Sequence, residues 1–201
     1  MQMQGNQIAL RDWQVADLEI YRFWTAPDHL WQQLDAPYYA KPTAEESEAS
    51  IASVKSAITA GKWPHPRRRM VIADRNSDSC IGQVSWYWIS EETYWPAVGI
   101  VIYDPTYWGQ GKGFEALGLW SDYLFGSQPE FARLDLRTWS GNSGMMRLAG
   151  KLGYQLEARF RKARIVIGEY YDGLGYGILR EEWTARYPNC FAAHLAEIIQ
   201  R

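Results

Sequence analysis

A buried strand that leads directly into a glycine-rich turn is the feature that most constrains this chain. Residues 98–103 read VGIVIY, Asp104 and Pro105 mark a turn, and glycines stand at the alternate positions 109, 111 and 113 before a helical stretch. Glycines allow a ligand close to the backbone, and several N–H groups and a helix N-terminus then face one point. The arrangement predicts a binding site for a phosphate or diphosphate.

Spacing excludes two other phosphate motifs. A Walker loop needs Gly-Lys-Ser/Thr after four spacer residues, and a dinucleotide fingerprint needs Gly-x-Gly-x-x-Gly near an early strand. Neither pattern fits this turn. The side chain of Lys112 either adds positive charge to the site or points into solvent, and Glu115 is interpreted as a first-turn acid that complements the helix dipole.

Hydrophobic periodicity predicts a mixed α/β chain with helices on both faces of one sheet. A capping-box pattern at Thr43 and Glu46 begins one helix and Gly61 ends it. Short connections predict an antiparallel meander in the middle of the chain. The expected strands are 8–11, 70–73, 81–89, 97–103, 134–139, 155–167 and 169–180, and the expected helices are 16–24, 43–60, 111–125, 142–152 and 191–199.

Composition excludes several classes of partner. A net charge of -2 and 47% hydrophobic residues describe an ordinary globular chain without the positive field that attracts nucleic acid or an anionic membrane. No apolar run approaches the length of a membrane span, and the polar N-terminus lacks the pattern of a secretory signal. Cys80 and Cys190, and the three histidines, show no zinc or disulfide spacing. We expect a cytoplasmic protein without a metal, as a monomer or a homodimer.

A second motif lies downstream of the glycine turn. Residues 142–154 read NSGMMRLAGKLGY, and together with the turn they resemble the GNAT superfamily of N-acetyltransferases. Residues 168–183 resemble the subgroup that includes the ribosomal-protein N-terminal acetyltransferases. The resemblance spans residues 8–183. It implies a GNAT-like fold, with a central twisted and mostly antiparallel sheet of about seven strands that is splayed between strands 4 and 5. It also implies a single domain over residues 1–183, followed by a C-terminal helical extension over 184–201.

The resemblance also implies acetyl-CoA as co-substrate and a set of residues that bind it. The fourth strand pairs with the pantetheine arm, the amides of the turn hold the pyrophosphate, and two residues of the following motif contact the cofactor. For Asn142 a helix N-cap is an alternative or additional role, and for Arg147 the alternative is a solvent-exposed helix face. The implied residues are Val101, Ile102, Tyr103, Gln110, Gly111, Lys112, Gly113, Phe114, Asn142 and Arg147.

Acyl transfer requires a neutral amine, a donor for the developing oxyanion and a thiolate that departs. By analogy with the family, a backbone N–H near Ile100 or Val101 polarises the thioester carbonyl, and the amine attacks directly. An α-amino group with a pKa of about 8 needs less help to lose its proton than a lysine with a pKa of about 10.4.

The chain departs from the family pattern at Val98, Met145 and Ala149, where polar residues are common. No catalytic residue is therefore assigned. The candidates to replace the missing base and acid are Glu91, Glu92, Tyr94, Tyr103 and Ser143.

Aromatic residues leave two interpretations open for the acceptor. Trp86, Trp88 and Trp95 either line a pocket for a small amine or pack in the core. A flat, open face favours a peptide N-terminus, whereas an aromatic pocket favours a small molecule. The alternative to an enzyme is an acyl-CoA-binding or regulatory module with little turnover, which the three departures from the family pattern favour.

Overall fold

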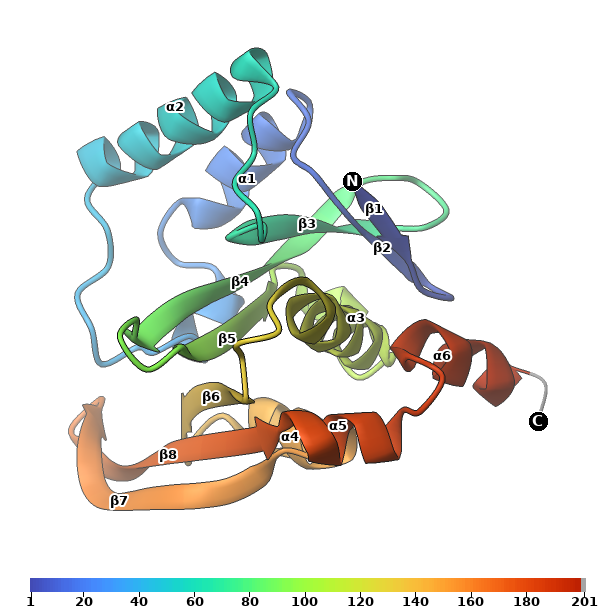
Figure 1. Cartoon of the computed structure of the whole chain (residues 1–201). Coiled ribbons are helices and arrows are strands. Elements are labelled where there is room, and N and C mark those ends of the chain that lie inside the picture. The colour runs from blue at the N-terminus through green and yellow to red at the C-terminus, as the bar shows by residue number, and fades with distance from the viewer. Residues whose placement is uncertain (200–201) are drawn as a thin grey trace.

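The predicted strands form one mixed sheet in the computed structural model, which describes residues 1–199 (Figure 1). The strand order is β1-β2-β3-β4-β5-β6-β8-β7. Every neighbouring pair is antiparallel except β5 and β6, which are parallel. The strands are β1 (Gln2–Gln4), β2 (Ile8–Arg11), β3 (Arg69–Asp74), β4 (Cys80–Ser90), β5 (Trp95–Ile102), β6 (Arg133–Trp139), β7 (Gln155–Val166) and β8 (Glu169–Leu179).

Two helices are bounded by the residues that local signals predict. At Thr43 the side-chain oxygen accepts the N–H of Glu46 at 3.2 Å while the Glu46 carboxylate accepts the N–H of Thr43 at 2.8 Å, which confirms the capping box. Gly61 and Gly153 end two helices in the left-handed conformation, with φ of 60° and 98°. The helices are α1 (Asp17–Thr25), α2 (Ala44–Ala60), α3 (Lys112–Ser127), α4 (Ser143–Leu152), α5 (Arg180–Arg186) and α6 (Phe191–Ile199).

Two elements differ from the prediction. Residues Gln2–Gln4 form an edge strand on β2, which adds an eighth strand to the expected seven. This strand is held by backbone pairing and by the half-buried Met3, and three residues are too few for alternation to reveal a strand. The last strand ends at Leu179, because Arg180 begins α5 and its guanidinium donates to three backbone carbonyls, including that of Phe131 at 3.0 Å.

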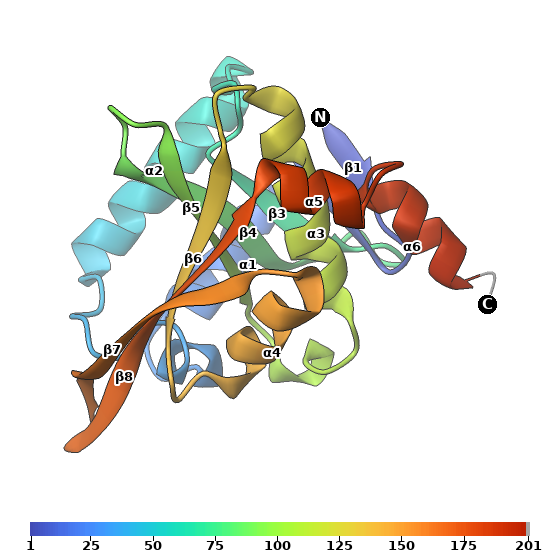
Figure 2. The same cartoon turned by 60° about the horizontal axis from the view of Figure 1, so that its bottom comes forward.

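Helices cover both faces of the sheet, which confirms the predicted mixed α/β fold (Figure 2). On one face, α1 and α2 bury a smaller apolar cluster against β3 and β4, with Tyr103 at its centre. On the other face, α3, α4, α5 and α6 bury the larger cluster, in which Trp120 and Phe131 are fully enclosed. Within residues 1–199, no helix combines the length and the apolar character needed to cross a bilayer.

The sheet opens between β5 and β6. Their parallel pairing is limited to Ala97 with Asp135 and Val98 with Leu136, and beyond Val98 the rest of β5 has no partner on that side. This confirms the splay predicted between the fourth and fifth strands, which are β5 and β6 once the edge strand β1 is counted. A strand with one free edge can pair with an extended ligand as it would with another strand.

The C-terminal helix α6 packs on α3. Phe191 at the start of α6 is fully buried, and its ring lies directly over Gly118 of α3. Trp183, Tyr187 and Leu195 belong to the same apolar cluster as the sheet. The described part of residues 184–201 thus packs into the main core, while the domain boundary at residue 183 remains a prediction.

The contact at Gly118 predicts a measurable loss of stability in Gly118→Ala. An added Cβ would lie 2.1 Å from the Phe191 ring, so α6 has to shift or the ring has to leave its site. We expect a destabilisation of about 1–3 kcal/mol, seen as a melting temperature lowered by about 2–4 °C per kcal/mol. The control Gly126→Ala lies in the same helix with no atom within 4 Å of its Cβ. Equal melting temperatures for the two variants would contradict this packing.

Candidate functional site

The glycine turn presents a row of free backbone donors. Gly109 and Gly111 adopt left-handed φ values of 72° and 86°, which side chains rarely tolerate, and α3 begins directly after them. In the chain as described, the N–H groups of residues 110–113 have no hydrogen-bond partner, whereas the N–H of Phe114 donates to the carbonyl of Gly111 at 3.0 Å. Four free donors at the N-terminus of a 16-residue helix favour an anion.

Gly113 keeps the space beside this turn open. A Cβ at this position would meet Leu148, Ile102 and Ile100 at ordinary contact distances of 3.6–4.0 Å. The backbone of Gly113 is helical, so neither strain nor collision requires a glycine here. The missing side chain leaves room between α3, α4 and β5, and this room fits the approach of a phosphorylated ligand to the free amides.

The side chain of Lys112 does not point into solvent, because it is held in a buried ion pair. Its Nζ lies 2.8 Å from Oδ2 of Asp74, and both side chains are buried. This ion pair lowers the pKa of Asp74. Glu115 is also buried, and its carboxylate accepts the N–H of Gln7 at 2.9 Å. The two charges fasten the first turn of α3 to the sheet, so only the backbone of Lys112 remains available to a ligand.

The free edge of β5 presents particular backbone groups. Tyr103 donates its N–H to the carbonyl of Ile81 at 2.9 Å, and Val101 lies on the same side of this antiparallel ladder. Alternate residues of a strand turn their N–H and C=O groups to opposite neighbours. The backbone groups of Ile100 and Ile102 therefore point away from β4 and into the gap that β6 leaves. Of the two amides considered for the oxyanion, the ladder favours Ile100.

Asn142 and Arg147 lie on α4. Asn142 is the N-cap, as its alternative role predicts, with Oδ1 accepting the N–H of Met145 at 2.9 Å. Its Nδ2 donates to the carbonyl of Leu34 at 3.2 Å, and Nε1 of Trp139 donates to the same carbonyl at 2.9 Å. These bonds hold the segment after Leu34 against the end of β6. Arg147 is solvent-exposed and forms no ion pair within residues 1–199.

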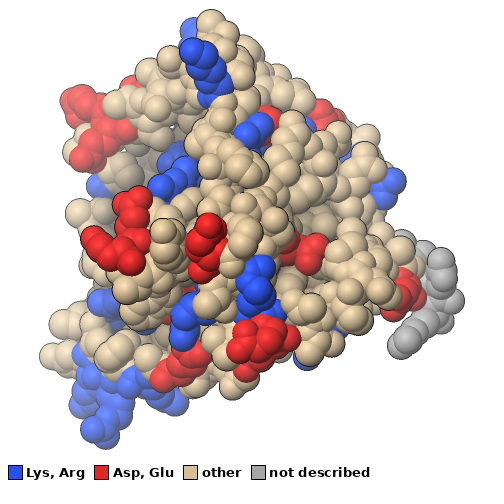
Figure 3. Space-filling view, viewed as in Figure 1, with Lys and Arg blue, Asp and Glu red and all other residues tan. Residues whose placement is uncertain are grey.

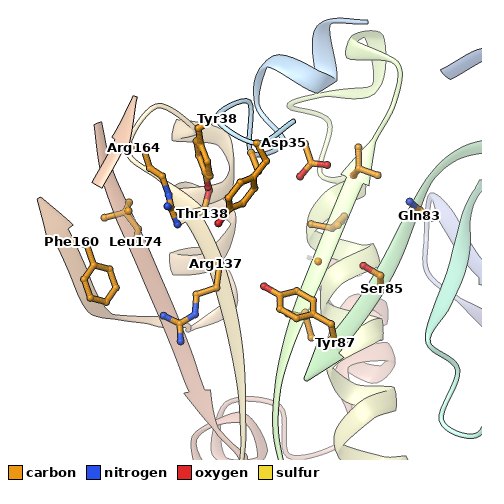
Figure 4. Close-up of a pocket in the computed structure, with 17 residues that line it drawn as sticks. Asp35, Tyr38, Gln83, Ser85, Tyr87, Arg137, Thr138, Phe160, Arg164 and Leu174 are labelled. Carbon is orange, nitrogen blue, oxygen red and sulfur yellow. The ribbon is translucent and has the colours of Figure 1, made fainter. Parts of the chain in front are cut away.

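A cavity of about 380 Å³ lies along the free part of β5, and we call it the β5 cavity (Figure 4). Polar side chains enter it from the segment between α1 and α2, from β4, from β6 and from the β7–β8 hairpin. Ser85 and Tyr87 come from β4, and Oε1 of Gln83 is buried without a hydrogen-bond partner among the described residues. The lining residues are Asp35, Ala36, Tyr38, Tyr39, Gln83, Ser85, Tyr87, Val98, Gly99, Ile100, Val101, Arg137, Thr138, Phe160, Arg164, Gly173 and Leu174.

Asp35 is the carboxylate of this cavity. Its side chain is exposed to solvent, yet the protein on its cavity side partly desolvates the carboxylate and raises its pKa above the ordinary value. Burial also raises the pKa of Tyr38 and of Tyr87, while nearby arginines oppose the rise. A carboxylate with a raised pKa holds a proton more readily near neutral pH, which suits it to proton transfer.

The structure separates the predicted catalytic candidates from the β5 cavity. Glu91, Glu92 and Tyr94 are exposed on the turn between β4 and β5, and hydrogen bonds from its own N–H and from Ser90 lower the pKa of Glu92, which weakens it as a base. Ser143 is exposed at the start of α4.

Tyr103 is enclosed on the α1–α2 face, where burial raises its pKa well above the usual value. Its hydroxyl has no hydrogen-bond partner among the described residues, and Tyr103 is not among the residues that line the β5 cavity. The three residues that depart from the family pattern lie in apolar surroundings. Val98 and Ala149 are buried, and Met145 packs against the core. None of the three supplies a proton.

Of the two interpretations of Trp86 and Trp88, the structure favours packing in the core over lining an acceptor pocket. Both pack against Phe131 in the core, with ring centroids 5.5 and 5.4 Å from it. Successive side chains of a strand point to opposite faces, so the neighbouring Tyr87 faces the cavity instead. Trp95 is outside the lining and packs against the guanidinium groups of Arg133 and Arg137.

Sequence reasoning missed Asp35, Arg137 and Arg164. One available signal was the alternation of Gln83, Ser85 and Tyr87 along an otherwise apolar strand, which marks one face of β4 as polar. No comparable signal marks Asp35, because it lies in an irregular segment that long-range hydrogen bonds position. Within the described chain, no group of three or more His, Cys, Asp or Glu side chains could hold a metal ion.

Comparisons with known proteins agree with this geometry. The family model described as an acetyltransferase (GNAT) domain matches residues 7–155. The chain is 24% identical over 185 residues to the uncharacterized N-acetyltransferase YnaD of Bacillus subtilis, covering 92% of this chain and 100% of that one. It is 25% identical over 117 residues to the SPbeta prophage-derived uncharacterized N-acetyltransferase YokL of the same organism, covering 58% of this chain and 64%, just under two thirds, of that relative.

Solved structures share the fold. The ribosomal-protein-S5-alanine acetyltransferase of Vibrio fischeri superposes with a TM-score of 0.69 at 18% identity, covering 91% of this chain and 98% of that one. An acetyltransferase of the GNAT family from Bacillus anthracis superposes with a TM-score of 0.68 at 18% identity, covering 90% and 100%.

Proposed function

This chain belongs to the acetyltransferase (GNAT) family, and on that premise we propose that it transfers the acetyl group of acetyl-CoA to a primary amine. The observation that carries the proposal is the free part of β5. The side chains of Ile100 and Ile102 lie beside Gly113 and the free amides. Residues 98–101 of the same strand line the β5 cavity. An anion site and an acceptor cavity thus meet at one unpaired strand.

The glycine turn holds the diphosphate of the co-substrate in this proposal. The N–H groups of residues 110–113 donate to it, and the dipole of α3 adds a partial positive charge. The N–H of Ile102 pairs with the extended arm, while its carbonyl accepts Nε1 of Trp108 at 2.9 Å. Acetyl-CoA supplies an acetyl group activated as a thioester, and the N–H of Ile100 is the donor that stabilises the developing oxyanion.

Asp35 deprotonates the acceptor. Its carboxylate attracts the incoming ammonium group and takes a proton from it, and its raised pKa brings the two groups closer in acidity. The buried Oε1 of Gln83 accepts a second N–H of the amine. The neutral amine then attacks the thioester directly, without a covalent enzyme intermediate.

The acceptor side has room for more than a small amine. A second cavity of about 900 Å³ between α1, α2 and the segment after α1 shares Asp35, Ala36, Tyr39 and Gln83 with the β5 cavity. This continuity supports a peptide N-terminus as the acceptor. The ribosomal-protein-S5-alanine acetyltransferase of Vibrio fischeri, which shares the fold, is named for such a substrate.

An assay of amine-dependent thiol release tests the proposal. We expect calorimetry to detect acetyl-CoA binding and free CoA to appear only when a suitable amine or peptide is added. The competing function, an acyl-CoA-binding or regulatory module, draws on the apolar residues Val98, Met145 and Ala149. It predicts binding without thiol release across a panel of peptides, amino acids and polyamines. Absence of acetyl-CoA binding by a folded sample would refute both functions.

A further inference from the structure

The β5 cavity contains two charged side chains of opposite sign that lack partners. Asp35 and Arg164 both line it, and neither forms an ion pair within residues 1–199. Both charges act on Tyr38, since Arg164 opposes the rise in the pKa of that tyrosine and Asp35 adds to it. Asp35 and Arg164 thus lie near the same ring of the cavity wall.

Arg164 is held in place but not neutralised. Its guanidinium lies over the ring of Tyr38 at 4.4 Å and near that of Tyr39 at 5.6 Å (Figure 4). Its Nε is buried without a hydrogen-bond partner in the described chain, and its Nη1 reaches only the carbonyl of Ala163 at 3.5 Å. Stacking on tyrosines orients the planar donors and leaves them for a ligand.

The other cation of the cavity is already neutralised. Arg137 donates to the buried carboxylate of Asp135 at 2.9 Å, and that carboxylate also binds Arg133. Arg133 in turn binds Glu157. The two arginines and two carboxylates of this network neutralise one another. Arg164 is therefore the cation of the cavity that remains for an acceptor.

The tip of the β7–β8 hairpin extends the positive charge beyond the cavity. Residues 158–168 contain four cations and no carboxylate, and one of the four, Arg159, pairs with Asp172 of β8 at 2.6 Å. Figure 3 shows Lys and Arg gathered over this hairpin at the lower left of the molecule. In a chain with a net charge of -2, a local cluster of this kind attracts anionic ligands to the cavity mouth.

From these contacts we infer that the acceptor is an amine that also carries a carboxylate, with the ammonium group at Asp35 and the carboxylate at Arg164. This inference rests on the proposed function and adds the substrate class. A polyamine is disfavoured, because its second ammonium group would meet the unneutralised Arg164. Two sources supply the required chemistry: a free amino acid, and a peptide whose N-terminal amine is followed by an acidic residue.

Matched acceptors distinguish the two sources and test the inference. Alanine has a carboxylate beside its amine, and alaninamide lacks it. The peptide amide Ala-Glu-NH₂ has a carboxylate on its second residue, and Ala-Gln-NH₂ lacks it. We expect at least one carboxylate-bearing member to have a kcat/KM roughly 10- to 100-fold above its neutral partner. Arg164→Met should remove this preference by raising KM for that member, with the KM for acetyl-CoA unchanged.

Arg161→Met is the matched control, since Arg161 lies on the same hairpin, is exposed and does not line the cavity. It should keep the preference. An equal loss in both variants would show that the general field of the hairpin acts, not a contact with Arg164, and would overturn the inference. Equal rates for both members of both pairs would overturn it while the proposed function stands.

A binding measurement separates failure of the inference from failure of the proposed function. Calorimetry with N-acetylalanine and with the N-acetylated form of Ala-Glu-NH₂ needs no turnover. We expect roughly 10- to 100-fold weaker binding by Arg164→Met than by Arg161→Met. If no amine releases CoA and this difference still appears, the proposed activity fails and the carboxylate site remains. If the difference is absent, the carboxylate site is refuted.

Discussion

Gly113→Leu is expected to weaken acetyl-CoA binding by about 100-fold or more, a loss of about 2.7 kcal/mol of binding free energy. The structure offers a Cβ at this position only ordinary contacts with Leu148, Ile102 and Ile100, so the fold accepts a side chain there. The added atoms fill the space through which the ligand reaches the free amides of residues 110–113. Calorimetry with acetyl-CoA measures the loss.

Stability and affinity should change in different directions at this position. A glycine in a helix costs up to about 1 kcal/mol relative to alanine, so Gly113→Ala is expected to leave the melting temperature unchanged or raised while it weakens binding. Gly126→Leu places the same side chain in the same helix with no atom within 4 Å of the Cβ. It should bind acetyl-CoA like the native protein. Unchanged affinity in Gly113→Leu would refute the placement of the diphosphate.

Asp35→Asn is expected to lower kcat by about 10²- to 10³-fold with the affinity for acetyl-CoA unchanged. Asparagine keeps the size of the side chain and removes the group that takes the proton. Because the pKa of Asp35 is raised, the native enzyme should lose activity with falling pH at a higher pH than an ordinary carboxylate would cause. This acid limb should be absent from the variant, which keeps only the titration of the amine itself.

Glu92→Gln is the control for Asp35. Glu92 is an exposed carboxylate with a lowered pKa outside the β5 cavity, and its variant should retain the native rate and pH profile. Rates measured by thiol release across the pH range compare the two variants. A native acid limb in Asp35→Asn would show that another group accepts the proton and would remove Asp35 from the mechanism.

Local patterns predicted the scaffold well because they act over a few residues. The capping box at Thr43 and the left-handed glycines are satisfied by neighbours in the chain, so their positions follow from sequence spacing. The free amides of the glycine turn follow in the same way. The short edge strand β1 and the helix α5 did not follow, because backbone pairing with β2 holds the first and the Arg180 side chain, reaching carbonyls more than 45 residues away, anchors the second.

The acceptor side depends on contacts that no local pattern contains. Asp35 reaches the β5 cavity because Trp139 and Asn142, more than 100 residues further along, both bind the carbonyl of Leu34. Arg164 reaches it because a long hairpin folds back beside Tyr38. Trp86 and Trp88 show the same dependence, since aromatic clustering in the sequence does not reveal which face of a strand lies against the core.

The sequence by itself determined the order of the strands and helices other than β1 and α5, the family and the turn that faces an anion, because spacing within a few residues encodes these features. Only the tertiary structure decided that Lys112 is fastened to Asp74, that Tyr87 rather than its tryptophan neighbours faces the cavity, and that Asp35 and Arg164 share it. The physical reason is that segments distant in the chain determine which partners a side chain has and how deeply it is buried. These contacts form only when those segments pack together.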